Sequence, residues 1–148
     1  MVILFSSTFP DSIPYTPLHS PSVPESCTCG CTMEEDSGEI IASGRCSQTS
    51  TWLISLPARH TIKLRFNFIN LYENKQWVRV RNGGTSGSDL IAFSDGRRQI
   101  DHVTSTSNQM LVEFFTESDD KTNTTYSRVP TKPIHVYGFI ATYTSNCK

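Results

Sequence analysis

The chain has 148 residues, which is enough for one domain with a complete hydrophobic core. Its formal net charge of -1 at pH 7 argues against nucleic acid or an anionic bilayer as its partner. No stretch approaches the ~20 consecutive apolar residues of a membrane span, so we expect no membrane insertion by this segment.

The first 26 residues differ in composition from the rest, because they contain five of the eight prolines. Proline fixes φ and removes a backbone donor, so residues 1–26 are predicted to be a disordered linker or stalk before a domain at 27–148. The opening run Met1–Phe5 is shorter than the roughly 7–15 apolar residues of a signal peptide. We therefore expect a fragment of a larger secreted or membrane-anchored protein.

The five cysteines favour an oxidising compartment, where they would form disulfides and leave one cysteine over. Three of them form a Cys-x-Cys-x-Cys cluster. Zinc sites normally space their thiolates as Cys-x2–4-Cys with a matching second pair, which this chain lacks. Disulfides are therefore favoured over a metal. The cysteines are Cys27, Cys29, Cys31, Cys46 and Cys147.

From residue 38 onward the pattern predicts short strands separated by turns, with no amphipathic helix. Asn82-Gly83-Gly84 is the strongest of the turn signals. Many short strands with Gly, Asn and Asp turns favour an antiparallel β-sandwich or barrel. The predicted strands cover residues 38–41, 52–56, 61–68, 77–81, 90–93, 110–114 and 134–143.

Strict alternation over residues 61–68 predicts a strand with one apolar face and one polar face. The predicted core positions are Ile62, Leu64, Phe66 and Phe68. Lys63 and Arg65 would then point to solvent.

A second alternating strand directs two further cations to solvent, Arg79 and Arg81. If the two strands are neighbours, as hairpin-linked strands usually are, Lys63, Arg65, Arg79 and Arg81 form one basic stripe. Such a stripe suits an acidic protein or a sulfated glycan. The alternative is an ordinary charged solvent face.

The polar stretch 116–133 is long for a loop in a compact domain. It contains the sequon Asn123-Thr124-Thr125, where we expect N-glycosylation. Glu117 with Asp119-Asp120 could be read as paired catalytic carboxylates, but a solvated loop explains them more simply. The histidines lack metal spacing and no Gly-x-Ser-x-Gly elbow occurs, so we expect no enzyme.

Residues 105–114 form a polar turn that leads into an alternating strand, and Tyr137–Tyr143 is aromatic-rich. Together they resemble the last two core strands of the CUB domain, an extracellular binding module. The resemblance extends in order over 31–147, through Gly38–Ile40, Trp52–Ile54, Ile62–Phe66 and Val78–Gly83. It implies an all-β, antiparallel, jelly-roll-like β-sandwich.

The family's disulfides are only partly matched. The second bridge of the family has no cysteines here, either beside Lys75–Trp77 or beside Phe93–Gly96. For the first bridge the resemblance implies Cys31 with Cys46. A terminal link from Cys27 or Cys29 to Cys147 would complete the set.

Many CUB domains bind calcium at one end of the sandwich through three acidic residues. The matching positions here are Tyr72 with Glu73 one residue late, Gln76 or Trp77, and Glu117. Calcium takes 6–8 oxygen ligands, so Glu73 and Glu117 alone make a poor site. We expect ordinary solvated carboxylates and no cofactor, with calcium at Glu73 and Glu117 as the less favoured alternative.

The resemblance implies a non-catalytic, extracellular protein–protein recognition module that works without calcium. The alternative is a carbohydrate- or glycosaminoglycan-binding module of the spermadhesin kind. A broad charged face would favour a protein partner, and exposed aromatic residues around a shallow pocket would favour a sugar.

Overall fold

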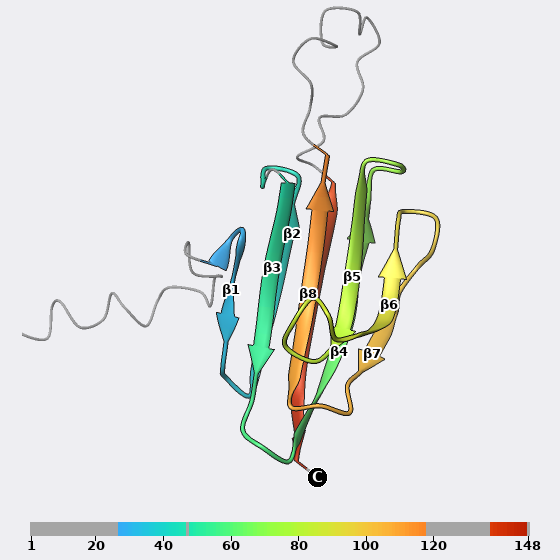
Figure 1. Ribbon diagram of the computed structural model, residues 1–148. Helices are drawn as coiled ribbons and strands as arrows, with labels where there is room; N and C mark the ends of the chain where they lie inside the picture. The colour runs from blue at the N-terminus through green and yellow to red at the C-terminus, as the bar shows by residue number, and fades with distance from the viewer. Residues whose placement is uncertain (1–26, 47, 118–136, 148) are drawn as a thin grey trace, which may run out of the picture.

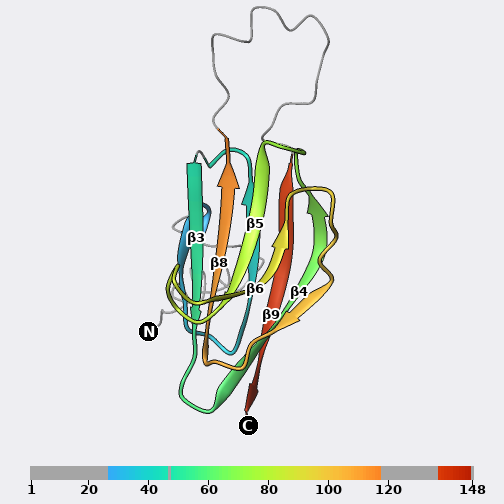
Figure 2. The ribbon, with the colours of Figure 1, turned by 45° about the vertical axis from the view of Figure 1, so that its right-hand side comes forward.

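The computed structural model describes residues 27–46, 48–117 and 137–147. The predicted stalk at 1–26 and the sequon at Asn123 lie outside them. The described residues form two β-sheets packed face to face (Figures 1 and 2). One layer contains β8 (Gln109–Thr116) and β5 (Gln76–Asn82), and the other contains β9 (Gly138–Cys147) and β4 (His60–Asn70). No helix among them is long and apolar enough to span a bilayer.

The larger layer is a five-stranded sheet in the order β1-β3-β8-β5-β6. Its strands are β1 Gly30–Met33, β3 Gln48–Ser55, β8 Gln109–Thr116, β5 Gln76–Asn82 and β6 Asp89–Ser94. Neighbouring strands in this layer are antiparallel, except for the parallel pair β1 and β3.

The smaller layer is a four-stranded, antiparallel sheet in the order β2-β9-β4-β7. Its strands are β2 Ser37–Ser43, β9 Gly138–Cys147, β4 His60–Asn70 and β7 His102–Thr104. The predicted all-β sandwich is confirmed. The short strands β1 and β7 were not predicted, because neither has an alternating sequence pattern of its own. Pairing with β3 and β4 holds them extended.

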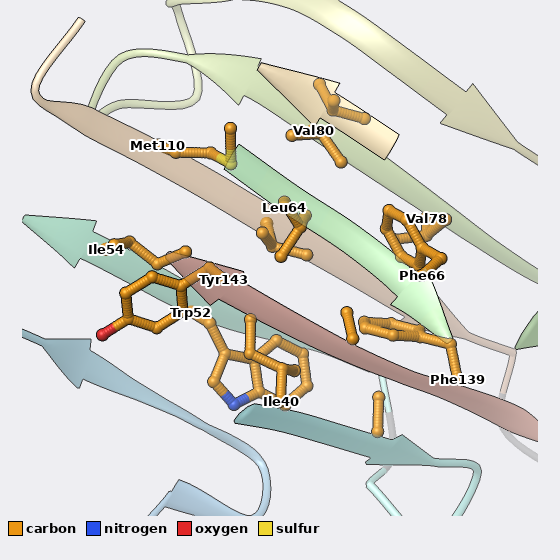
Figure 3. Packing of buried hydrophobic residues seen from close by; sticks show 14 of the residues in the cluster. Ile40, Trp52, Ile54, Leu64, Phe66, Val78, Val80, Met110, Phe139 and Tyr143 are labelled. Atoms are coloured by element: carbon orange, nitrogen blue, oxygen red, sulfur yellow. The ribbon is translucent and has the colours of Figure 1, made fainter. Parts of the chain in front are cut away.

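The core lies between the sheets and includes Phe139 of β9 (Figure 3). The ring of Phe139 makes edge-to-face contacts with Trp52, Phe66 and Phe114, at centroid distances of 6.1, 5.3 and 5.6 Å. The indole Nε1 of Trp52 donates a hydrogen bond to the carbonyl oxygen of Cys27 at 2.9 Å. Such aromatic pairs stabilise a core beyond the area that they bury.

Phe68 is not in the core, so its predicted burial is wrong. The register of β4 against β9 shifts between Phe66 and Phe68, which leaves Asn67 as an extra residue on β4. A bulge of this kind changes the face on which the following side chain lies. Phe68 is 50% exposed, whereas Phe66 is 6% exposed.

The buried Tyr143 lies under Gly38, its register partner on β2. Its hydroxyl donates a hydrogen bond to the carbonyl oxygen of Glu35 at 2.9 Å. Burial, reinforced by the charges of Glu35 and Asp36, raises the pKa of Tyr143 to about 12. The folded state therefore keeps this proton at pH values where the unfolded chain loses it.

We expect the stabilisation by the Tyr143 hydroxyl to be fully present below pH 10 and lost as the pH rises toward 12. Tyr143→Phe should lower the free energy of unfolding by about 1 kcal/mol at pH 8, through the lost hydrogen bond. At pH 10.5 the difference between the two proteins should shrink by about 1 kcal/mol, because the tyrosine of the unfolded wild type ionises at this pH and thereby stabilises the unfolded state. Urea titrations at both pH values measure it, and an unchanged difference would contradict the assignment.

Candidate functional site

The four cations of the predicted basic stripe lie on two different sheets, so the single stripe is wrong. Lys63 and Arg65 are on β4, between β9 and β7, whereas Arg79 and Arg81 are on β5, between β8 and β6. The connection after β4 is not a hairpin. It crosses from one layer to the other through a turn in which the amide N–H groups of residues 75 and 76 donate to the carbonyl oxygen of Tyr72.

On the five-stranded sheet both arginines lie beside one acidic residue, Glu113. The Nε of Arg81 lies 2.7 Å from Oε1 of Glu113, and its Nη1 donates to the carbonyl oxygen of Ser88 at 3.1 Å. Arg79 is the register partner of Glu113 on the adjacent strand. Arg81 is therefore held in a mostly buried ion pair, and Arg79 lies beside the same carboxylate.

Trp77 and Phe115 lie on the same outer face and stack with their ring centroids 4.2 Å apart and their planes at 16°. Each ring covers one face of the other. The pair is only partly exposed, so it differs from the open cluster of aromatic residues around a pocket that would favour a sugar.

On the four-stranded sheet, Lys63 and Arg65 alternate with fully buried core residues and are exposed. None of the ion pairs within residues 27–46, 48–117 and 137–147 involves either cation. Their register neighbours on β9 are the hydroxyl residues Thr144 and Thr142. On β7 the partner of Arg65 is His102, whose Nδ1 lies 3.2 Å from Oδ2 of Asp101.

The two candidate calcium ligands are each engaged by a basic side chain. Oε1 of Glu73 lies 3.1 Å from Nε of Arg97, and Oε1 of Glu117 lies 3.4 Å from Nζ of Lys75. Both ion pairs are half exposed, so each is worth roughly 0–1 kcal/mol and neither would prevent binding by itself. They do place positive charge at both carboxylates.

Gln76 occupies the position of an expected central ligand, and its side chain is already used. It is fully buried, its Oε1 accepts the N–H of Tyr72 at 2.8 Å, and its Nε2 faces Oγ1 of Thr116 at 3.5 Å. The ring of Tyr72 packs edge-on against Tyr137, with centroids 5.1 Å apart. The amide oxygen of Gln76 is already occupied by a backbone N–H, and its other polar group is an N–H donor. Such a side chain does not suit calcium, which requires oxygen ligands.

We expect the thermal midpoint of the full chain to be the same in 2 mM calcium and in chelator. A saturated site would stabilise the fold by RT ln(1 + [L]/Kd), about 2.7 kcal/mol at a hundredfold excess over Kd, and raise the midpoint by several degrees. A differential scanning measurement in both buffers decides it. A clear rise with calcium would show that Glu73 and Glu117 leave their basic partners to bind the ion.

The disulfides differ from the predicted pairing of Cys31 with Cys46. The structure joins Cys29 to Cys46 and Cys27 to Cys31, so Cys147 belongs to neither of these two bridges. The reason is the parallel register of β1 and β3, which sets Cys31 level with Trp52. Cys46 precedes the start of β3, so a residue earlier in the chain than Cys31 lies closer to it.

A catalytic or metal centre finds no support in the parts of the chain that are described. They contain no group of three or more His, Cys, Asp or Glu side chains placed to hold a metal ion. The remaining carboxylates of the loop, Asp119 and Asp120, lie outside the described residues. The surfaces that remain as candidate sites are the outer faces of the two sheets.

Comparison with protein families matches residues 29–127 to the model of the CUB domain. Among curated proteins the chain is similar to cubilin of Sus scrofa, with 38% identity over 72 residues, or 46% of this chain and 2% of that protein. It is also similar to a bone morphogenetic protein 1 homolog of Strongylocentrotus purpuratus, with 30% identity over 98 residues, or 60% of this chain and 15% of that protein. The chain spans a small part of these relatives.

Two solved structures share the sandwich. The full extracellular region of zebrafish Gpr126/Adgrg6 superposes with a TM-score of 0.58 at 20% identity, over 82% of this chain and 15% of that one. The MASP-1 CUB2 domain bound to Ca2+ gives a TM-score of 0.58 at 11% identity, over 80% of this chain and 99% of that one. At these identities the likeness establishes the fold alone.

Proposed function

Because this chain belongs to the CUB domain family, we propose that it is a non-catalytic recognition module that binds a protein partner outside the cell. The extracellular assignment is supported by the zebrafish structure, which is described as an extracellular region. The two disulfides agree with it, since disulfides persist in oxidising compartments. The module would act as part of a larger secreted or membrane-anchored protein.

One observation carries the proposal of a protein partner. Lys63 and Arg65 stand exposed on the outer face of the four-stranded sheet, outside every ion pair in the described part of the chain. By contrast, Arg81 on the other sheet is committed to Glu113. Exposed charges on a flat face speed encounter with an oppositely charged partner and fix its orientation.

The proposed recognition is independent of calcium. This is supported by the end of the sandwich at Gln76, whose polar groups are satisfied within the protein. The contacts would then come from a sheet face rather than from an ion at the loops.

The alternative is a sulfated carbohydrate, as in a module of the spermadhesin kind, and the same two cations would favour it. A sulfated glycan repeats its negative charges along its chain, whereas Lys63 and Arg65 are two cations on one strand. Exposed apolar side chains on the same sheet, among them Phe68 and Ile41, favour a protein partner.

The test is binding of the full chain, in chelator, to a panel of purified extracellular domains and, separately, to a heparin column. We expect at least one protein of the panel to bind. Charge reversal with Lys63→Glu and Arg65→Glu should weaken that binding about tenfold or more, because two favourable charges become repulsive. The matched control is Arg79→Glu, which makes the same change on the other sheet and should leave binding unchanged.

Retention on heparin alone, lost in the Lys63→Glu and Arg65→Glu variant, would replace the protein partner with a sulfated glycan. Binding that requires calcium, or that survives reversal of both cations, would overturn the proposed mode of recognition.

A further inference from the structure

The bulge in β4 directs an aromatic side chain to solvent that the alternation of the sequence would place in the core. Phe68 follows Phe66 by two residues, yet the extra residue Asn67 between them puts the two rings on opposite faces of the sheet. Oδ1 of Asn67 accepts a hydrogen bond from Oγ1 of Thr142 at 3.0 Å, which ties the bulge to β9. Bulges are enriched beside functional sites because they re-aim side chains in this way.

Phe68 has two apolar neighbours on the same face, and together they form what we call the apolar row: Phe68, Ile140 and Ile41. Phe68 is the register partner of Ile140, and Ile140 is the register partner of Ile41 on β2. Phe68 is 50% exposed and Ile41 is 40% exposed. With strands ~4.8 Å apart, the row crosses three strands over about 10 Å.

The sequence contains a signal for this row that alternation alone does not explain. Ile40-Ile41 and Phe139-Ile140 are adjacent apolar pairs in strands, so one member of each pair must face outward. In both pairs the first residue is buried in the core and the second lies on the outer face. Three apolar side chains thus meet in one register row on a face that is otherwise polar.

The surroundings of the apolar row carry a positive charge on one side. Arg65 pairs in register with Thr142, two residues of β9 from Ile140, so it lies about 7 Å along the strands from the row. Lys63 pairs with Thr144 and lies two residues beyond Arg65 on the same face, farther from the row. Two acidic residues lie near Arg65: Glu39 pairs with Thr142 from the opposite side of β9, and Asp101 contacts His102, the partner of Arg65 on β7.

We propose that the apolar row and the adjoining cations form one docking surface for a protein segment that combines apolar side chains with flanking carboxylates. The apolar side chains of the partner would pack on Phe68 and Ile41, and its carboxylates would pair with Arg65 and Lys63. This arrangement has an apolar centre and a charged rim, as protein interfaces do, with an aromatic residue as the anchor. The inference rests on the proposed function and names the surface and the partner chemistry.

The probe is a phage-displayed library of random 12-residue peptides, selected on the immobilised full chain in chelator and depleted on the Phe68→Ala variant. We expect the enriched peptides to combine aromatic or aliphatic residues with Asp or Glu. Synthetic copies should bind Phe68→Ala and Ile41→Thr at least tenfold more weakly than the wild type. Phe93→Ala is the matched control, because Phe93 is a partly exposed aromatic residue on β6 of the other sheet, and it should bind like the wild type.

A charge swap identifies the role of the cations. Arg65→Glu should lower the affinity for the acidic peptides, and replacing their Asp or Glu residues with lysine should restore binding to this variant. Phe68 and Arg65 are both exposed, so the Phe68→Ala and Arg65→Glu variants should keep the thermal midpoint of the wild type within a few degrees. An unchanged midpoint would show that they fold.

Three results would overturn the inference. Peptides that bind Phe68→Ala as well as the wild type, or a selection that yields no peptide able to tell the two apart, would exclude the apolar row as a binding surface. Sedimentation that shows a dimer of the wild type and a monomer of Phe68→Ala would assign the row to a second copy of this chain. If panel proteins still bind through Lys63 and Arg65 while Phe68→Ala has no effect, the proposed function stands and this surface alone fails.

Discussion

Phe139→Ala is expected to lower the free energy of unfolding by about 4 kcal/mol, within the range for large-to-small substitutions of buried aromatic residues. The side chain is 1% exposed, and its ring touches three other core rings, those of Trp52, Phe66 and Phe114. These three residues come from both sheets, so the cavity would open where the two layers meet and could not be filled by one strand alone.

Domains of this size are stable by only about 5–15 kcal/mol, so Phe139→Ala should also reduce the yield of secreted protein. The measurement is a urea titration of wild type and variant at pH 7.4. Phe68→Ala is the matched control, since it removes the same kind of side chain from the same sheet at a half-exposed position. It should cost under about 1 kcal/mol. Equal losses at the two positions would show that Phe68 is packed into the protein and would contradict the register shift in β4.

The contrast between these two phenylalanines shows how far the sequence determines the fold. Alternation over residues 61–68 correctly predicts the strand and the burial of Ile62, Leu64 and Phe66. It is wrong for Phe68, because the bulge depends on how β4 pairs with β9, and Asn67 at the bulge is 75 residues from its hydrogen-bond partner Thr142 on β9. Local periodicity carries no information on such long-range register.

The basic residues show the same limit at the level of topology. Alternation correctly predicts that Lys63 and Arg65 point to solvent, whereas Arg79 and Arg81, which were also expected there, are only partly exposed. It does not predict which sheet a strand joins. In a sandwich whose successive strands mostly cross between layers, adjacency in sequence does not imply adjacency in space. The apolar row was missed for the same reason, since its members come from three strands far apart in the chain.

The second prediction concerns the bridge between Cys29 and Cys46. Replacing both with alanine should lower the free energy of unfolding by about 3 kcal/mol, the loop-closure value for a 17-residue separation. The bridge joins the start of β1 to the turn before β3, so its loss should release the edge of the five-stranded sheet first. Replacing Cys27 and Cys31 together should cost less, about 2 kcal/mol, because that bridge closes only four residues.

The pairing itself is tested by a third double variant, in which Cys31 and Cys46 are replaced with alanine. These residues come from two different bridges, so the change leaves both Cys27 and Cys29 without their partners. The thiol content measured in denaturant should therefore exceed that of the wild type, whereas the Cys29 and Cys46 variant should match the wild type. Proteases cannot separate three cysteines within five residues, which makes thiol counting the sharper assay. If the Cys31 and Cys46 variant instead kept the thiol content of the wild type, the bridge implied by the sequence resemblance would be the real one. The register of β1 against β3 would then have to differ, because Cys31 could not reach Cys46 while it pairs with Trp52.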